Sequence, residues 1–296
     1  AARGYVGTVD RASGLITDRR AGRLPSPEGA ALCRQLAGVR LPGVEVTVEP
    51  VREHRFVLRL RGDGLSDKVA DTDPNQVGLP PLEPRALAPE AERTAHLLQT
   101  FVAEGRRLLA SHPQANMLLL RGLSRFPHLP SLAEAYRLRP AAVAAYPMYL
   151  GLARLLGFQV VPCGASFPEE VQALRENFAR YDFFYLHYKA ADTAGEDGDF
   201  EGKVRALEAL DPFVPQLLDL KPDVFLVTGD HSTPSLLGGH SWHPVPLLLH
   251  SRWTGGDGVA AFTERECAKG SLGRLPATHL MLLALAHAGK LTKFGP

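Results

Sequence analysis

The sequence predicts an α/β protein in which a sheet wrapped by helices follows a smaller α+β lobe. From Pro140 onward, short apolar runs alternate with helical patterns, which is typical of a parallel sheet with helical connections. Before that point, residues 44–51 and 55–61 alternate apolar and polar side chains, as half-buried antiparallel strands do. A length of 296 residues is enough for two sizeable cores. We therefore expect one lobe over residues 1–135 and a second over residues 136–296.

The first lobe is expected to open with a hairpin, because residues 5–10 and 15–18 flank the turn sequence Arg11-Ala-Ser-Gly14. A helix is predicted over residues 25–37, with Ser26 as N-cap and Pro27 at the first helical position. Proline-rich residues 71–89 are interpreted as a structured loop. The remaining predicted elements are strands 44–51, 55–61 and 116–120 and a helix over 90–109.

The second lobe is expected to alternate between the two kinds of element without internal repeats. The predicted helices are 141–156, 167–181, 202–218 and 278–289, and the predicted strands are 158–161, 183–188, 224–228 and 245–249.

Composition indicates a soluble, cytoplasmic enzyme. The chain has 33 basic and 32 acidic residues, which gives a formal net charge of +1 and no general attraction to nucleic acid. Cys33, Cys163 and Cys267 are widely spaced and odd in number, which favours reduced thiols over disulfides or a cysteine zinc site. No apolar run approaches the roughly 20 residues that span a bilayer, so no membrane partner is expected.

Acidic and histidine side chains follow two apolar runs that are expected to be buried strands. They are Asp192, Glu196, Asp230, His231 and His240. Functional crevices in open α/β sheets lie beyond the carboxyl ends of the strands, so two neighbouring strands would gather these side chains in one place. Oxygen and nitrogen ligands of this kind predict a pair of metal sites. The alternatives are a helix N-cap with a hydrogen-bonded histidine at Asp230-His231, and a solvated acidic face at Asp192 and Glu196.

Three motifs at this point resemble the signatures of a known family. They are Lys189-Ala-Ala-Asp192-Thr-Ala-Gly-Glu196-Asp-Gly-Asp199, Thr228-Gly-Asp230-His231-Ser-Thr-Pro234 and Gly239-His240-Ser-Trp-His-Pro244-Val-Pro246. Together they resemble the bisphosphoglycerate-independent phosphoglycerate mutases, in their archaeal-type branch, within the alkaline phosphatase superfamily. The resemblance runs from Arg3-Gly4 to the tail Ala286-His-Ala-Gly289-Lys290-Leu-Thr-Lys293-Phe-Gly295. It implies an alkaline-phosphatase-like sheet in the second lobe and an active site between the lobes.

The resemblance also implies a ligand assignment. Asp192, Glu196 and His240 are similar to the ligands of one divalent ion, and Asp230 with His231 to part of a second set. Many members of the wider family carry histidine where this chain has Glu196, and glutamate shifts the expected metal toward Mn²⁺ or Mg²⁺, with Zn²⁺ or Co²⁺ as alternatives. His243 is a weaker candidate, and His187 is expected to be a packed strand residue.

Basic residues beside glycines are the candidates for binding the phosphorylated substrate. Arg3 and Arg121 each place a guanidinium where it can meet a phosphate or carboxylate in bidentate fashion, and Arg19 and Arg20 in the motif Asp18-Arg-Arg-Ala-Gly22 are similar. The alternative for each is a solvated surface arginine. Asp71 and Asp73 are interpreted as contacts to substrate hydroxyls, or as an Asx turn before Pro74.

The activity implied by the resemblance is interconversion of 3-phosphoglycerate and 2-phosphoglycerate through a phosphoserine. In the family, a segment with an early aspartate and this serine precedes the point that matches Arg3-Gly4. We therefore expect the nucleophile to lie outside residues 1–296, and this stretch alone to be inactive. Ser232 and Ser241 are expected to have turn and supporting roles. A metal-dependent phosphatase of the same superfamily, and a non-catalytic fragment, are the alternatives.

Overall fold

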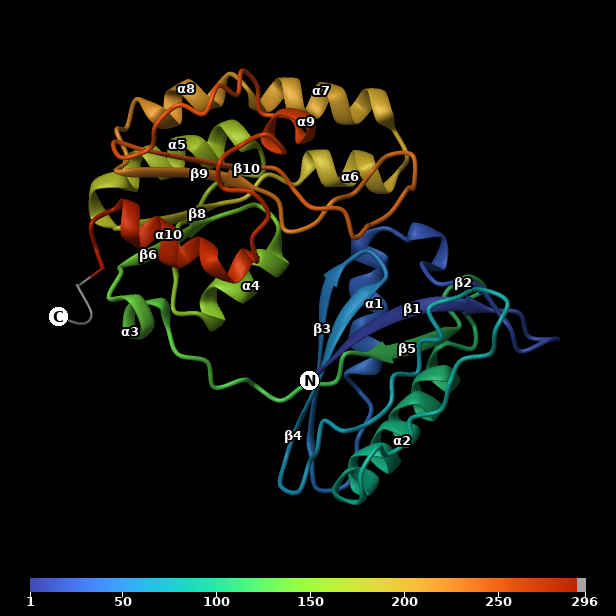
Figure 1. Ribbon diagram of the computed structural model, residues 1–296. Helices are drawn as coiled ribbons and strands as arrows, with labels where there is room; N and C mark the ends of the chain where they lie inside the picture. The colour runs from blue at the N-terminus through green and yellow to red at the C-terminus, as the bar shows by residue number, and fades with distance from the viewer. Residues whose placement is uncertain (292–296) are drawn as a thin grey trace. The chain divides into compact units, whose positions relative to one another are not determined.

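The computed structural model describes residues 1–291 and divides into two compact units, Ala1–His128 and Leu129–Pro296 (Figure 1). Residues 292–296, which include Lys293 and Gly295 of the C-terminal motif, lie outside the described residues. The predicted division into a substrate and phosphotransfer lobe over residues 1–135 and a metal-binding, phosphatase-like lobe over residues 136–296 stays a prediction. Within residues 1–291, no helix combines the length and the apolar character needed to cross a membrane.

The first unit is built on an antiparallel sheet whose central strand is β1. Strand β1 pairs with β4 and β5 and, near its end, with β2 in the predicted hairpin, while β3 pairs with the outer side of β4. The strands are β1 (Ala2–Val9), β2 (Ile16–Asp18), β3 (Glu45–Arg52), β4 (Arg55–Arg61) and β5 (Met117–Arg121).

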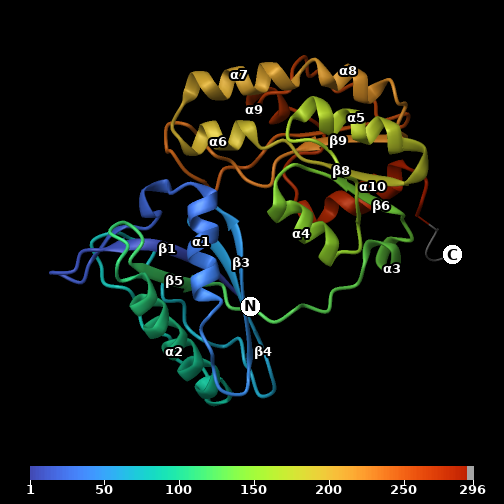
Figure 2. The same cartoon turned by 180° about the vertical axis from the view of Figure 1, so that it is seen from behind.

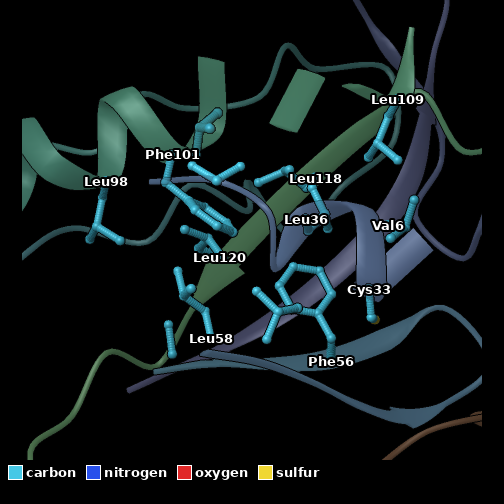
Figure 3. Packing of buried hydrophobic residues seen from close by; sticks show 14 of the residues in the cluster. Val6, Cys33, Leu36, Phe56, Leu58, Leu98, Phe101, Leu109, Leu118 and Leu120 are labelled. Carbon is cyan, nitrogen blue, oxygen red and sulfur yellow. The ribbon is translucent and has the colours of Figure 1, made fainter. Parts of the chain in front are cut away.

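Helices α1 (Ser26–Leu36) and α2 (Glu92–Leu109) pack against this sheet through one continuous apolar cluster, seen in Figure 3. Phe101 of α2 and Phe56 of β4 are both fully buried. Gly105 lets α2 approach β5, because a Cβ there would lie 2.2 Å from Leu118 Cδ2. Side chains alternate across a strand, so residues that neighbour this cluster in sequence face the opposite side of the sheet.

The connecting segments are short or well bonded. Two short 3₁₀ helices, η1 (Ala21–Arg23) and η2 (Pro89–Ala91), precede α1 and α2. Residues 71–89 form a structured loop, as predicted, with the Thr72 N–H donating to the Leu120 carbonyl at 2.8 Å. The prediction that Ser26 caps α1 is wrong. Its hydroxyl accepts from the Glu53 N–H at 3.0 Å and Pro25 occupies the cap, so tertiary contact replaced local capping.

The second unit contains a parallel sheet of order β7-β6-β8 and a separate antiparallel pair, β9 with β10. Their bounds are β6 (Pro140–Val143), β7 (Gln159–Val160), β8 (Phe183–Leu186), β9 (Val224–Thr228) and β10 (Leu247–Ser251). Figures 1 and 2 show these strands in one layer, with α5, α7 and α8 on one side and α4 and α10 on the other. The functional consequence is that the segments after β8 and β9 come together although the two strands belong to different sheets.

The helices of the second unit are short, and several occupy the loops that follow strands. They are α3 (Leu132–Tyr136), α4 (Pro147–Leu155), α5 (Phe167–Asn177), α6 (Ala190–Glu196), α7 (Phe200–Leu210), α8 (Phe213–Leu218), α9 (Glu264–Cys267) and α10 (Leu280–His287), with 3₁₀ turns η3 (Phe178–Arg180) and η4 (Ala277–His279).

Two helix predictions in this unit need correction, and proline explains both. The predicted helix over 141–156 is instead β6 followed by α4, which starts at Pro147 because proline lacks the N–H that a helix interior needs. The predicted helix over 202–218 is two helices, α7 and α8, separated at Asp211-Pro212. The run Ala141-Ala-Val143 is fully buried in the sheet, so tertiary burial outweighs the helical propensity of alanine there.

Glu170 of α5 is a buried carboxyl group in the core of the second unit. One oxygen accepts from the Ala145 N–H at 2.7 Å, and the other is buried without a partner. This burial raises the pKa of Glu170 to about 7. The Cys163 thiol, which interacts electrostatically with Glu170, also has a raised pKa, mainly because it is desolvated. The native state therefore holds the Glu170 proton more tightly than the unfolded chain, where the pKa is about 4.3.

We expect the contribution of Glu170 to the free energy of unfolding to fall as pH rises from about 5 to 8. A group whose pKa is raised by folding stabilises the native state fully below its pKa in the unfolded chain. This stabilisation is lost as pH rises through its pKa in the folded protein. Glu170→Gln cannot ionise, so the difference in unfolding free energy between variant and parent should move in favour of the variant by about 1–3 kcal/mol between pH 5 and 8. Urea unfolding at both pH values measures it. Glu169→Gln is the matched control. Glu169 is exposed, and hydrogen bonds from Ser166 lower the pKa of its carboxyl, so this group stays ionised over the whole pH range. A difference that is independent of pH would contradict the prediction.

Candidate functional site

The five predicted metal ligands converge in the second unit. Helix α6 begins three residues after β8 and carries Asp192 and Glu196 one turn apart, on one face. Asp230 and His231 follow β9 after one residue, Gly229. His240 lies further along the same connection to β10, which is tied back by a bridge between Ser232 and Ser241.

Three of these residues offer one ligand atom each within a small volume. The ligand atoms of Asp192, His231 and His240 all lie within 4.8 Å of one another. Glu196 Oε1 is 3.3 Å from His240 Nε2, and Asp230 Oδ2 is 3.4 Å from His231 Nε2, so each end of the group gains a further carboxylate. The two imidazole rings are stacked, with centroids 3.8 Å apart. Carboxylate oxygens with imidazole nitrogens suit a divalent cation, and the residues present therefore fit one.

The hydroxyl of Thr233 joins two members of the group. It donates to Asp192 Oδ1 at 2.6 Å and lies 3.1 Å from His231 Nδ1. Since a hydroxyl has one hydrogen, its oxygen must accept from Nδ1, and a neutral His231 then keeps its lone pair on Nε2. This is the arrangement expected of a histidine that is prepared to bind metal through Nε2.

Asp192 is the most enclosed carboxylate of the group, with 18% of its side chain exposed. Burial alone raises the pKa of this carboxyl, but hydrogen bonds from Lys189 and Thr233, with the charge of Lys189, hold it below its usual value. Lys189 itself lies over the Tyr146 ring, 5.6 Å from the centroid. Asp192 is therefore ionised and oriented near neutral pH.

His243 lies outside the ligand group. Its Nδ1 is 2.8 Å from the Ser241 hydroxyl, and its ring stacks on Trp242 at 4.4 Å. The Ser232 hydroxyl donates to the His243 carbonyl at 3.1 Å, which holds the loop closed. These contacts agree with supporting roles for the two serines.

A second group of charged side chains lies on the first unit, on the sheet face that the helices leave uncovered. Arg3 and Arg121 are direct partners across β1 and β5, and both guanidinium groups lie over the Tyr5 ring, at 5.0 and 5.8 Å. Like charges directly opposite in an antiparallel pair are unfavourable. Such a pair suits a surface that receives an anion.

Asp73 organises this arginine group. Its carboxylate, which is 1% exposed, accepts from Arg19 Nε at 3.1 Å and lies 3.6 Å from Arg121 Nη1. Asn75 adds an oxygen that accepts from Arg121 at 2.8 Å and Arg19 at 3.1 Å. Two guanidinium groups, those of Arg19 and Arg121, contact this one carboxylate, and Arg3 of β1 lies next to Arg121.

The other two predicted substrate residues are placed differently. Asp71 is exposed, and its carboxylate accepts from the Gly122 N–H at 2.7 Å, which fixes the end of β5 next to Arg121. Arg20 is exposed, and its backbone N–H donates to Asp18 at 2.7 Å. Arg19, its neighbour in the same motif, is the residue that joins Asp73.

Sequence reasoning missed several residues that these groups contain. Thr233 lies inside a motif that was recognised, so its neighbours were the available signal. Asn75 follows Asp73-Pro74 and could have been considered with it. Tyr149, which donates to Asp230 at 2.9 Å, lies 81 residues earlier on α4 and carries no pattern of its own.

Comparison with known proteins agrees with this chemistry. A family model described as the Metalloenzyme superfamily matches residues 60–287, and one described as 2,3-bisphosphoglycerate-independent phosphoglycerate mutase matches residues 1–115. A probable 2,3-bisphosphoglycerate-independent phosphoglycerate mutase from Thermus thermophilus is 49% identical over 300 residues, covering 100% of this chain and 74% of that protein. The chain belongs to this mutase family.

Other members give the same result. A probable mutase of the same description from Aquifex aeolicus is 44% identical and covers 100% of this chain and 75% of its own length. The solved cofactor-independent phosphoglycerate mutase from Thermoplasma acidophilum matches with a TM-score of 0.67 at 29% identity, over 97% of this chain and 76% of that one. A Pyrococcus horikoshii structure, with a TM-score of 0.81 over 100% of this chain and 75% of that chain, is 24% identical and shows the shared fold.

The ligand group leads to a prediction for this family member. Asp192→Ala and His240→Ala should each weaken Mn²⁺ binding by more than about 100-fold, because losing a ligand exceeds the 10–100-fold effect typical of supporting residues. His243→Ala should change it by less than about 3-fold, since that ring contacts Ser241 and Trp242 instead. Calorimetric titration with MnCl₂ measures both. Equal losses at His240 and His243 would show that the wrong histidine is assigned.

Proposed function

We propose that this protein is a metal-dependent isomerase that interconverts 3-phosphoglycerate and 2-phosphoglycerate in glycolysis. The observation that carries the proposal is the group formed by Asp192, His231 and His240, within a chain of this mutase family. The phosphorylated serine that the family resemblance implies is not assigned to any residue of this chain.

The second unit supplies the metal ligands. Asp192, Glu196 and His240 would hold one divalent ion, and Asp230 with His231 would contribute to a second. Bound divalent ions neutralise charge on the attacking and leaving oxygens of a transferring phosphoryl group. Three of the five side chains are carboxylates, so hard ions such as Mn²⁺ or Mg²⁺ are favoured over Zn²⁺ or Co²⁺. Thr233 and Lys189 keep Asp192 ionised and oriented before any ion binds.

The first unit supplies anion-binding groups. Arg3 and Arg121 present guanidinium groups from neighbouring strands, and such forks match carboxylate and phosphate oxygens. Arg19 belongs to the same group through Asp73. Phosphoglycerate carries both kinds of anion, which suits a surface with several arginines. Asp71 supports this surface through the backbone of Gly122.

A metal-dependent phosphatase of the same superfamily would share the metal ligands. The arginine group favours the mutase, because an isomerase must retain glycerate after its phosphoryl group has left. Product analysis distinguishes the two: isomer exchange without free phosphate supports the mutase, and stoichiometric phosphate release supports the phosphatase.

The protein in its full native length should convert 3-phosphoglycerate to 2-phosphoglycerate without added bisphosphoglycerate. Activity should fall to background after chelation and return when MnCl₂ or MgCl₂ is added, since the ligands alone cannot neutralise the phosphoryl oxygens. An enolase-coupled assay measures the rate. Full activity after thorough metal removal, or a requirement for bisphosphoglycerate, would reject the proposal.

Arg121→Ala should raise the KM for 3-phosphoglycerate by about 10–100-fold, the loss expected for a charged bidentate hydrogen bond. Arg125→Ala is the control, because Arg125 is an exposed arginine four residues away that pairs with Asp67. Steady-state kinetics at saturating metal measure both variants. A KM close to that of the parent would remove Arg121 from the substrate contacts.

A further inference from the structure

Asp230 is the least enclosed carboxylate among the predicted ligands, with 55% of its side chain exposed. An exposed aspartate ordinarily samples several orientations, which would work against a fixed ligand position. Its Oδ1 accepts from the N–H of adjacent His231 at 3.1 Å. Both partners of that bond lie on the same loop. The bond therefore cannot fix the position of the Asp230 side chain relative to the rest of the second unit.

The Tyr149 hydroxyl provides this longer-range contact. It donates to Asp230 Oδ2 at 2.9 Å from the first turn of helix α4, 81 residues away in the sequence. Tyr149 is itself 8% exposed, so its ring is fixed by packing. The donor therefore has a definite position relative to the parallel sheet, against which α4 packs.

The His187 ring packs against the ring of Tyr149. The two rings are stacked with centroids 3.6 Å apart, and Tyr185 lies within 6.4 Å of the same ring. Both residues come from β8 and the segment just after it, which leads into α6 and Asp192.

We propose that Tyr149, backed by His187, is a positioning residue that fixes Asp230 for metal binding. This inference rests on the proposed metal site and adds to it a residue that lies outside every recognised motif. Tyr149 does not act as a ligand in this proposal. It acts through Asp230 by restricting the orientations of the carboxylate, in the way that outer hydrogen-bond partners generally orient metal ligands.

Tyr149→Phe tests this directly, because it removes the hydroxyl and keeps the stacked ring. Tyr188→Phe is the matched control: the Tyr188 hydroxyl also makes one hydrogen bond, 2.7 Å to the Ala206 carbonyl, away from the ligands. Both variants lose a comparable bond and should show similar urea midpoints without metal. In MnCl₂ titrations of the 296-residue chain, Tyr149→Phe should weaken binding about 10-fold or more, and Tyr188→Phe should not.

Each outcome bears on a different claim. A parent-like Kd for Tyr149→Phe, or an equal loss in both variants, would overturn the positioning role and leave the metal site intact. Failure of the parent chain to bind Mn²⁺ would reject the proposed metal site, and the inference with it. A selective loss in Tyr149→Phe with unchanged metal-free stability supports the role.

Discussion

Keeping Asp192 charged in a partly buried position is the constraint on which the ligand group depends. A carboxylate that loses water must regain its hydrogen bonds from the protein, or it will take up a proton. Thr233 and Lys189 supply those bonds, and Thr233 in turn determines which nitrogen of His231 carries hydrogen. The Thr233 hydroxyl therefore donates a hydrogen bond to the Asp192 carboxylate and leaves Nε2 of His231 free to bind a metal. The group is organised before any ion is present, which reduces the ordering that binding must later accomplish.

The first unit meets the opposite problem, an excess of positive charge. Arg3 and Arg121 face each other across neighbouring strands, and their repulsion is reduced in two ways. The Tyr5 ring offers both guanidinium groups its negative face, and buried Asp73 neutralises part of the charge on Arg121. One carboxylate is too few to balance Arg3, Arg19 and Arg121. This surface therefore keeps a net positive charge that can bind an anion.

The sequence predicted the parts of this molecule that depend on local chemistry. Strand patterns located β3, β4 and β9 closely, and the chemistry of the segments after β8 and β9 predicted the side chains that the structure brings together. It failed where tertiary burial decides, as at Ala141-Ala-Val143, whose composition favours helix. It offered Asp73 as a substrate contact or an Asx turn; the structure shows the Asx turn, in which the Asn75 N–H donates to Asp73 Oδ1 at 2.9 Å, and two arginines engage the same carboxylate. Tyr149 was beyond reach, because a contact across 81 residues leaves no periodic trace.

The pairing of the strands differs from the arrangement that the sequence predicted for the ligand segments. We expected the ligand segments to meet because two parallel strands would lie next to each other, yet β8 pairs with β6, and β9 pairs antiparallel with β10. Backbone pairing therefore does not bring the two ligand segments together. Side chains do so instead: Thr233 reaches Asp192, Lys203 donates to the Thr233 carbonyl at 2.6 Å, and Tyr149 reaches Asp230. A site assembled this way depends on a few polar contacts of about 1 kcal/mol each. Its geometry is thus more sensitive to single hydroxyl groups than the surrounding fold is.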